Sequence, residues 1–130
     1  MSFSTPAGRI SPKIKTVTAW HEALNSGDVE SLLDLSHPDF EMGGPRGMVR
    51  GAQTLREWVD RAKIRLEPER VFHEKDTVVA EQRAEWQAGG QQTVASIFVV
   101  RDGLVTSVVR YPGLAEALRE ANLDERHAVG

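Results

Sequence analysis

The chain has 130 residues, a formal net charge of -3 and no cysteine. This length is typical of one domain with a real core, and the absence of cysteine excludes disulfides, thiolate metal sites and cysteine nucleophiles. The acidic balance without a basic run argues against nucleic acid. The first residues lack the apolar segment of a secretory signal, and no apolar run approaches the ~20 residues of a membrane span. We therefore expect a cytoplasmic protein that binds neither nucleic acid nor membranes.

The first half of the sequence predicts three helices. Residues 1–10 carry Ser, Thr, Pro and Gly, which is typical of a loose, flexible arm. The pair Ser11-Pro12 is a helix start, and the helix should stop at Asn25-Ser26-Gly27. A second helix is expected from the cap Asp28 to His37-Pro38, and a third from Ala52 to about Lys63. Between them, Phe40 to Met42 could form a very short strand, followed by a loop over residues 43–47.

The second half predicts four antiparallel strands. Pro68 should break the chain, and strands are expected at Glu69–Glu74 and Thr77–Gln87. The stretch Gln92–Tyr111 reads as a hairpin, because Asp-Gly lies between two apolar runs at its centre. A short helix from Leu114 to Asn122 and a frayed tail over residues 125–130 complete the layout. Helices first and strands after predict an α+β fold with helices packed on one face of a curved sheet.

Both arms of the predicted hairpin are apolar on both faces. Val94, Ser96, Phe98 and Val100 share one face of the first arm, and the residues between them are mostly apolar as well. A strand with two apolar faces is usually covered on both. One cover should be the chain's own helices, and we expect the other to be a second subunit.

Three segments resemble the nuclear transport factor 2-like superfamily, in its SnoaL-like (polyketide cyclase-like and ketosteroid isomerase-like) branch. They are TVTAWHEALNSGDVESLLDLSHPDF, RGAQTLREWVDRA and RDGLVTSVVRYPGLAEALREANL. The resemblance implies one domain over residues 11–124: a cone-shaped, curved mixed β-sheet wrapped around three N-terminal helices, with a short C-terminal helix and a pocket in the mouth. It also implies a homodimer through the outer face of the sheet, and no cofactor.

The residues that do the chemistry in the best-known relatives are not matched here. By this resemblance, the tyrosine of the ketosteroid isomerase-like oxyanion site corresponds to Trp20, and the catalytic base falls at or beside Met42, next to Glu41. The aspartate on the sheet falls near Ser96, and the cyclase acid falls in the run Tyr111-Pro112-Gly113. Since Met42 cannot take a proton, the resemblance does not carry that mechanism over.

Several other residues are candidates for a site. Arg110 could receive a carboxylate or enolate oxygen at the pocket mouth, or could simply reach into solvent. Glu41 or His73 could move a proton, or could be exposed residues without a role. No pair of histidines has metal-ligand spacing, so we expect no metal. The predicted ligand-binding residues are Trp20, Phe40, Met42, Trp58, Ser96, Phe98, Val108 and Arg110.

Three functions are consistent with this sequence. The first is a pocket that binds a small apolar or aromatic ligand. The second is a cofactor-independent cyclase, isomerase or hydratase that uses acid–base chemistry, with Arg110 stabilising an oxyanion. The third is a non-catalytic dimerisation module. A cavity that contains a carboxylate or an imidazole would favour the enzyme.

Overall fold

A computed structural model of the protein describes residues 11–44 and 47–129. The predicted flexible arm, the middle of the predicted 43–47 loop and the last residue of the tail lie outside these ranges. The elements, in chain order, are α1 (Pro12–Ser26), α2 (Val29–Asp34), β1 (Ser36–Gly44), β2 (Gly47–Arg50), α3 (Ala52–Ala62), β3 (Ile64–Glu74), β4 (Thr77–Trp86), β5 (Gln91–Arg101), β6 (Leu104–Tyr111), α4 (Leu114–Ala121), a 3-10 helix (Glu125–His127) and β7 (Ala128–Val129).

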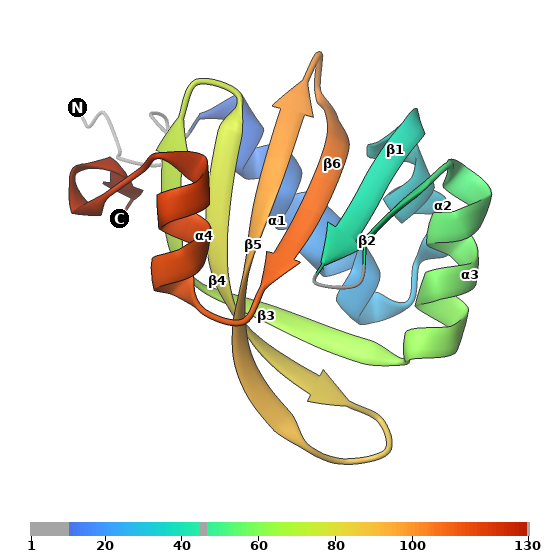
Figure 1. The fold of residues 1–130 in the computed structure, drawn as a ribbon. Coiled ribbons are helices and arrows are strands. Elements are labelled where there is room, and N and C mark those ends of the chain that lie inside the picture. Colours follow the sequence, from blue (N-terminus) through green and yellow to red (C-terminus); the bar gives the residue numbers. More distant parts are fainter. Residues whose placement is uncertain (1–10, 45–46, 130) are drawn as a thin grey trace, which may run out of the picture.

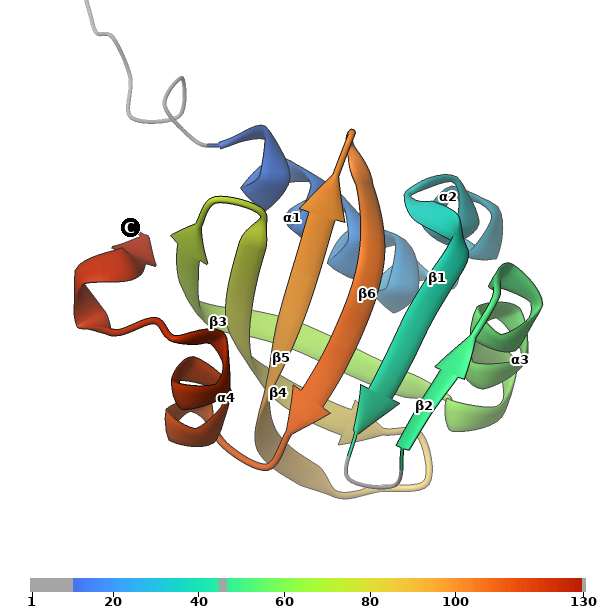
Figure 2. The ribbon, with the colours of Figure 1, turned by 45° about the horizontal axis from the view of Figure 1, so that its top comes forward.

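The described strands form one curved sheet in the order β2-β1-β6-β5-β4-β3-β7 (Figure 1). Strands β1 and β6 are parallel, and every other neighbouring pair is antiparallel. Helix α1 lies inside the curve, while β1 and β2 extend the sheet towards α3 (Figure 2). The predicted α+β fold with a curved mixed sheet around the N-terminal helices is therefore confirmed.

Local chemistry explains where the elements start and stop. The Ser11 side chain accepts a hydrogen bond from the backbone of Lys13 at 3.1 Å and caps α1, and Gly27 ends that helix with a left-handed φ of 74°. At the centre of the hairpin, Asp102 and Gly103 have φ values of 55° and 77°. The predicted helix boundaries around α1 and the predicted turn between β5 and β6 are thus confirmed.

The prediction that Pro68 breaks the chain is wrong. Strand β3 runs through this residue, and the pairing with β4 shifts register between Pro68 and Val71. Proline is tolerated at bulges and on strands whose N–H side has no partner. Strand β7 pairs with β3 only at Val71 and Phe72, so the other edge of β3 is unpaired at Pro68 within the described chain.

The predicted end of the second helix at His37-Pro38 is wrong, because α2 stops at Asp34 and these two residues belong to β1. The other differences lie at the two ends of the sheet. Strand β1 spans nine residues where a very short strand was expected, because it pairs with both β2 and β6. The end of the chain, expected to fray, forms the 3-10 helix, and β7 adds to the edge of β3. The pairings of β1 with β6 and of β3 with β7 have no local sequence signal, since their partners are far apart in the chain.

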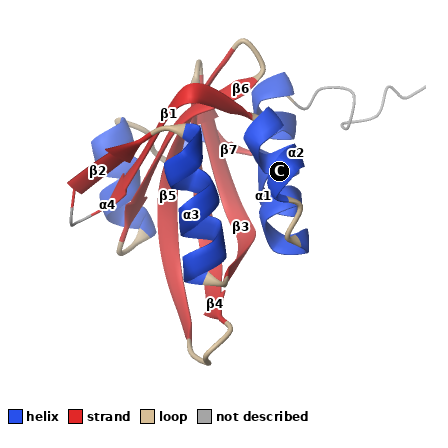
Figure 3. Cartoon of the chain, turned by 90° about the vertical axis from the view of Figure 1, so that its right-hand side faces the viewer, coloured by secondary structure: helices blue, strands red, loops and turns tan. Residues whose placement is uncertain are grey.

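The core has two parts, one on each face of the sheet. The larger part lies on the concave side, where Val94, Phe98 and Val100 of the hairpin pack with residues of α1 such as Trp20 and Leu24. On the outer face, α4 covers Phe72, Val79 and Ala95, and it lies on the opposite side of the sheet from α1 (Figure 3). Around Ala95, the outer face of the hairpin is therefore covered by the chain's own helix α4 and not by a second subunit. A homodimer through the rest of this face stays a prediction.

Candidate functional site

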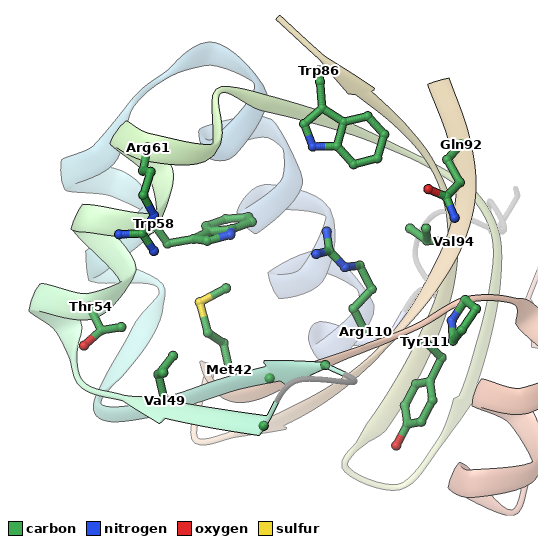
Figure 4. Close-up of a pocket in the computed structure, with 14 residues that line it drawn as sticks. Met42, Val49, Thr54, Trp58, Arg61, Trp86, Gln92, Val94, Arg110 and Tyr111 are labelled. Carbon is green, nitrogen blue, oxygen red and sulfur yellow. The ribbon is translucent and has the colours of Figure 1, made fainter. Parts of the chain in front are cut away.

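A cavity of about 540 Å³ opens between α3, the β1–β2 hairpin and the ends of β4, β5 and β6 (Figure 4). It lies at the mouth of the cone rather than along its interior. Its walls are the side chains and glycine backbone of Met42, Gly43, Gly44, Gly47, Val49, Thr54, Trp58, Arg61, Trp86, Gln92, Val94, Arg110, Tyr111 and Pro112.

Helix α3 supplies one wall through residues on a single stripe. Thr54, Trp58 and Arg61 are spaced four and three positions apart, so they point from the same side of the helix. The adjacent stripe contains the fully buried Leu55, which fixes the helix against the core. Packing of Leu55 thus turns the indole of Trp58 towards the cavity, and Arg61 follows it at the rim.

Strand β6 supplies the opposite wall. Arg110 pairs with Ser96 of β5, and both lie on the concave face of the sheet. Ser96 is buried, whereas Arg110, further along the same row, is half-buried and points towards the middle of the cavity (Figure 4). Met42 of β1 pairs with Val108 and reaches the same space from the next strand.

The charge of the cavity is one-sided. Its described lining contains two arginines, Arg61 and Arg110, and no aspartate, glutamate or histidine. Within residues 11–44 and 47–129, neither of these arginines has a carboxylate oxygen within 4.0 Å. Burial, with Glu120 and Glu116 nearby, raises the pKa of Tyr111, so its phenol stays neutral at neutral pH. The described lining therefore favours anions and contains no carboxylate or imidazole that could take a proton.

The SnoaL-like domain model matches residues 17–108, which is more than half of the chain. The chain belongs to the SnoaL-like family. No curated protein matches the sequence.

Solved structures share the fold of this SnoaL-like chain at low sequence identity. A nuclear transport factor 2-like protein of unknown function from Cytophaga hutchinsonii is 18% identical, with a TM-score of 0.72 over 76% of this chain and 88% of that one. TerC, co-crystallized with polyporic acid, is 24% identical, with a TM-score of 0.68 over 85% and 97% of the two chains. A computationally designed 17-OHP binder is 17% identical, with a TM-score of 0.70 over 81% and 93%. At these identities the likeness shows the fold alone.

Of the eight predicted ligand-binding residues, three line the cavity of this SnoaL-like domain: Met42, Trp58 and Arg110. The other five are buried in the domain's interior. They are Trp20, Phe40, Ser96, Phe98 and Val108, each less than 10% exposed. The indole of Trp20 meets the ring of Phe98 edge-on at 5.4 Å, so these aromatic groups fill the inside of the cone.

The two positions that correspond to oxyanion donors in ketosteroid isomerase-like relatives are engaged within the chain. The indole N–H of Trp20 donates to Ser36 at 3.2 Å, and the hydroxyl of Ser96 donates to Gln82 at 2.7 Å. Gln82 in turn contacts His21, which burial keeps neutral by lowering its pKa to about 4. These polar groups therefore satisfy one another and do not face the cavity.

The two predicted proton carriers lie away from the cavity. Glu41 alternates with Met42 along β1, so it points to the other face of the sheet, where it forms an ion pair with Arg50 at 2.5 Å. His73 lies near the far end of β3, and its Nε2 contacts the backbone carbonyl of Lys75 at 2.8 Å. The structure does not bring Glu41, His73 and Arg110 together.

Sequence reasoning missed several residues of the cavity wall. Arg61 was recognisable in principle, because it continues the Thr54–Trp58 stripe beside the apolar stripe of α3. Gln92 follows the β4–β5 turn, and Val49 lies on β2, whose pairing with β1 was not predicted. These positions depend on how far the sheet extends past the core, which has no local signal.

Other kinds of site find no support in the described residues. No group of three or more His, Cys, Asp or Glu side chains within them is arranged to hold a metal ion. None of the described helices is both long and apolar enough to cross a membrane.

Proposed function

We propose that this SnoaL-like chain binds a small apolar or aromatic ligand that carries an anionic oxygen, and that Arg110 receives this oxygen. The observation that carries the proposal is the position of Arg110. Arg110 is half-buried, its guanidinium faces a cavity of about 540 Å³, and no carboxylate of the described residues lies within 4.0 Å of it. A guanidinium without a carboxylate partner is suited to bind a carboxylate through two parallel hydrogen bonds, or to donate to the single oxygen of an enolate.

The rest of the wall favours an apolar body for this ligand. Trp58, Trp86 and Met42 face the same space from three different elements (Figure 4). Aromatic rings and a polarisable thioether provide contacts for a flat hydrophobic molecule, while a few polar groups fix its orientation. Two structural neighbours, TerC with polyporic acid and the designed 17-OHP binder, are ligand-binding examples of this fold.

The alternative is a cofactor-independent cyclase, isomerase or hydratase in which Arg110 stabilises an oxyanion while Glu41 or His73 moves a proton. General acid–base catalysis needs a titratable group within hydrogen-bond reach of the ligand. The described lining contains no carboxylate or imidazole, and neither Glu41 nor His73 belongs to it. This composition favours binding over acid–base catalysis.

A thermal-shift screen tests the proposal. Aromatic and terpenoid acids are screened against the wild type, Arg110→Ala and Arg119→Ala, the last being a control that removes an exposed arginine on α4, away from the cavity. We expect ligand-dependent shifts in the wild type and in Arg119→Ala that are lost in Arg110→Ala. If Arg110→Ala keeps every shift, or if no acid shifts the wild type, the proposal is wrong.

We also propose a homodimer through the part of the outer sheet face that α4 leaves open. Val99, Ser107 and Val109 of the hairpin lie on this face and are partly exposed in the single chain. Light scattering tests this: a mass of two chains is expected, and a monomer at all concentrations would overturn it. The cytoplasmic location likewise stays a prediction, and fractionation of cells that express the native gene tests it.

A further inference from the structure

Two guanidinium groups face one cavity from opposite walls, and they differ in depth. Arg110 comes from β6 and is half-buried, whereas Arg61 comes from α3 and is exposed at the rim. In Figure 4 the indole of Trp58 extends from the side of Arg61 towards the guanidinium of Arg110. The cavity therefore has a cation at each end of an aromatic surface.

Neither arginine forms an ion pair within 4.0 Å with an acid of the described chain. The acids of α3 are engaged elsewhere, because Asp60 contacts Lys63 at 3.6 Å and Glu57 accepts from Gln53 at 3.3 Å. Across the mouth, Glu85 accepts a hydrogen bond from Gln91 at 2.6 Å. One anionic group on a ligand would pair with one arginine and leave the other facing the same space without a partner.

We propose that the cavity selects elongated aromatic ligands with an anionic oxygen at each end, one received by Arg110 inside and the other by Arg61 at the rim. This inference rests on the proposed function and adds to it the charge and shape of the ligand. Arg110 anchors any aromatic acid, since its ion pair is partly shielded from water. Arg61 distinguishes dianions from monoanions, and because it is exposed its contribution is smaller and more sensitive to salt.

The test compares two ligands that differ only at one end. Biphenyl monocarboxylate and the biphenyl dicarboxylate with its second carboxylate at the far end of the other ring are titrated by calorimetry into the wild type, Arg61→Gln, Arg110→Gln and the control Arg119→Gln. A matching pair of naphthalene acids repeats the comparison with a shorter body. Tryptophan fluorescence provides a second readout, because two of the three tryptophans line the cavity.

We expect the wild type to bind the dicarboxylate about three- to fivefold more tightly than the monocarboxylate, the range of an exposed ion pair. Arg61→Gln should remove this preference and leave the monocarboxylate affinity unchanged. Arg110→Gln should weaken both ligands by roughly tenfold or more, as for a charged pair that is partly shielded from water. The preference for the dicarboxylate should also shrink as salt is raised from low concentration to about 1 M.

The outcomes separate this inference from the proposed function. If both ligands bind equally and Arg61→Gln changes nothing, the dianion inference is overturned while the anion site at Arg110 stands. If Arg119→Gln removes the preference as well, the effect is general electrostatics and the inference is again overturned. If no aromatic acid of either series binds, both proposals fail.

Discussion

The side-chain amide of Gln82 donates to Nε2 of His21 across 2.8 Å, where both side chains are buried. On the other side of the imidazole, Nδ1 lies 2.8 Å from the backbone carbonyl of Val17. Because a carbonyl can only accept, the ring is neutral and carries its proton on Nδ1. The hydroxyl of Ser96 donates to the amide oxygen of Gln82 at 2.7 Å. The directions of the hydrogen bonds that link Val17, His21, Gln82 and Ser96 are therefore consistent with this one tautomer of His21.

His21 should make the protein less stable in mild acid. Burial lowers its pKa from 6.5 to about 4, outweighing the opposite effects of the Val17 carbonyl and Glu67. In the unfolded chain His21 therefore binds a proton below about pH 6.5, whereas in the folded chain it binds one only below about pH 4. Stability from this group is full above pH 6.5 and is lost as the pH falls towards 4, by on the order of 3 kcal/mol. Urea unfolding between pH 4 and 7 measures the loss.

The matched variants for this pH effect are His21→Gln and His73→Gln. The first removes the buried titrating group, so its stability should change much less over this pH range than that of the wild type. The second removes a partly exposed histidine and should keep the wild-type profile. An unchanged slope in His21→Gln would show that other groups cause the acid sensitivity.

Ser96→Ala should destabilise the fold without touching the cavity wall. The substitution leaves the buried amide oxygen of Gln82 without the donor that it has in the wild type, which costs about 1–3 kcal/mol. Replacing both partners, as in Ser96→Ala with Gln82→Met, should cost less than the sum of the single changes. Chemical denaturation measures all three, with Ser107→Ala on β6, partly exposed, as the control. Additive losses would contradict this account of the network.

The sequence carries the local features of this fold clearly and its long-range pairings poorly. The cap at Ser11, the stop at Gly27 and the turn at Asp102-Gly103 depend on neighbouring residues, so their chemistry can be recognised in a single segment. By contrast, the parallel pairing of Met42 with Val108 joins segments that are far apart, and nothing in either segment specifies its partner. The missed length of β1 follows from that pairing.

The same limit explains the mixed result for the site. Ser96, Phe98 and Arg110, which the sequence predicted as ligand-binding residues, lie on one concave face of the sheet. Whether a concave face is open or filled depends on the combined volume of side chains from several elements. Here Trp20 and Phe98 fill the interior, so the cavity begins only at Arg110, nearer the rim. Sequence patterns show which way a side chain points, but not which other side chains occupy the same space.

Ala117→Asp should release α4 from the outer face while the rest of the fold persists. Ala117 is fully buried against an apolar cluster that includes Phe72 and Ala95, and an unpaired carboxylate there has no partner to offset its loss of water. Hydrogen exchange should rise in α4 and β7, and binding of a hydrophobic dye should increase. Ala115→Asp is the matched control, because that position is exposed in the first turn of α4, where an acid is favourable. Equal exchange in both variants would mean that α4 is not held by this contact.

Substitutions at Trp58 and Phe98 should separate an effect on ligand affinity from an effect on the free energy of unfolding. Phe98 is fully buried in the core, so Phe98→Ala should cost about 3–5 kcal/mol of unfolding free energy. The half-buried Trp58 lines the cavity, so Trp58→Ala should destabilise the fold less and reduce affinity for an aromatic acid more. Urea unfolding and calorimetric titration measure the two effects, and the milder Phe98→Leu serves if Phe98→Ala does not fold. If Phe98→Leu weakens binding more than Trp58→Ala does, the ligand enters the interior of the cone, and the mouth between α3 and β6 is not the site.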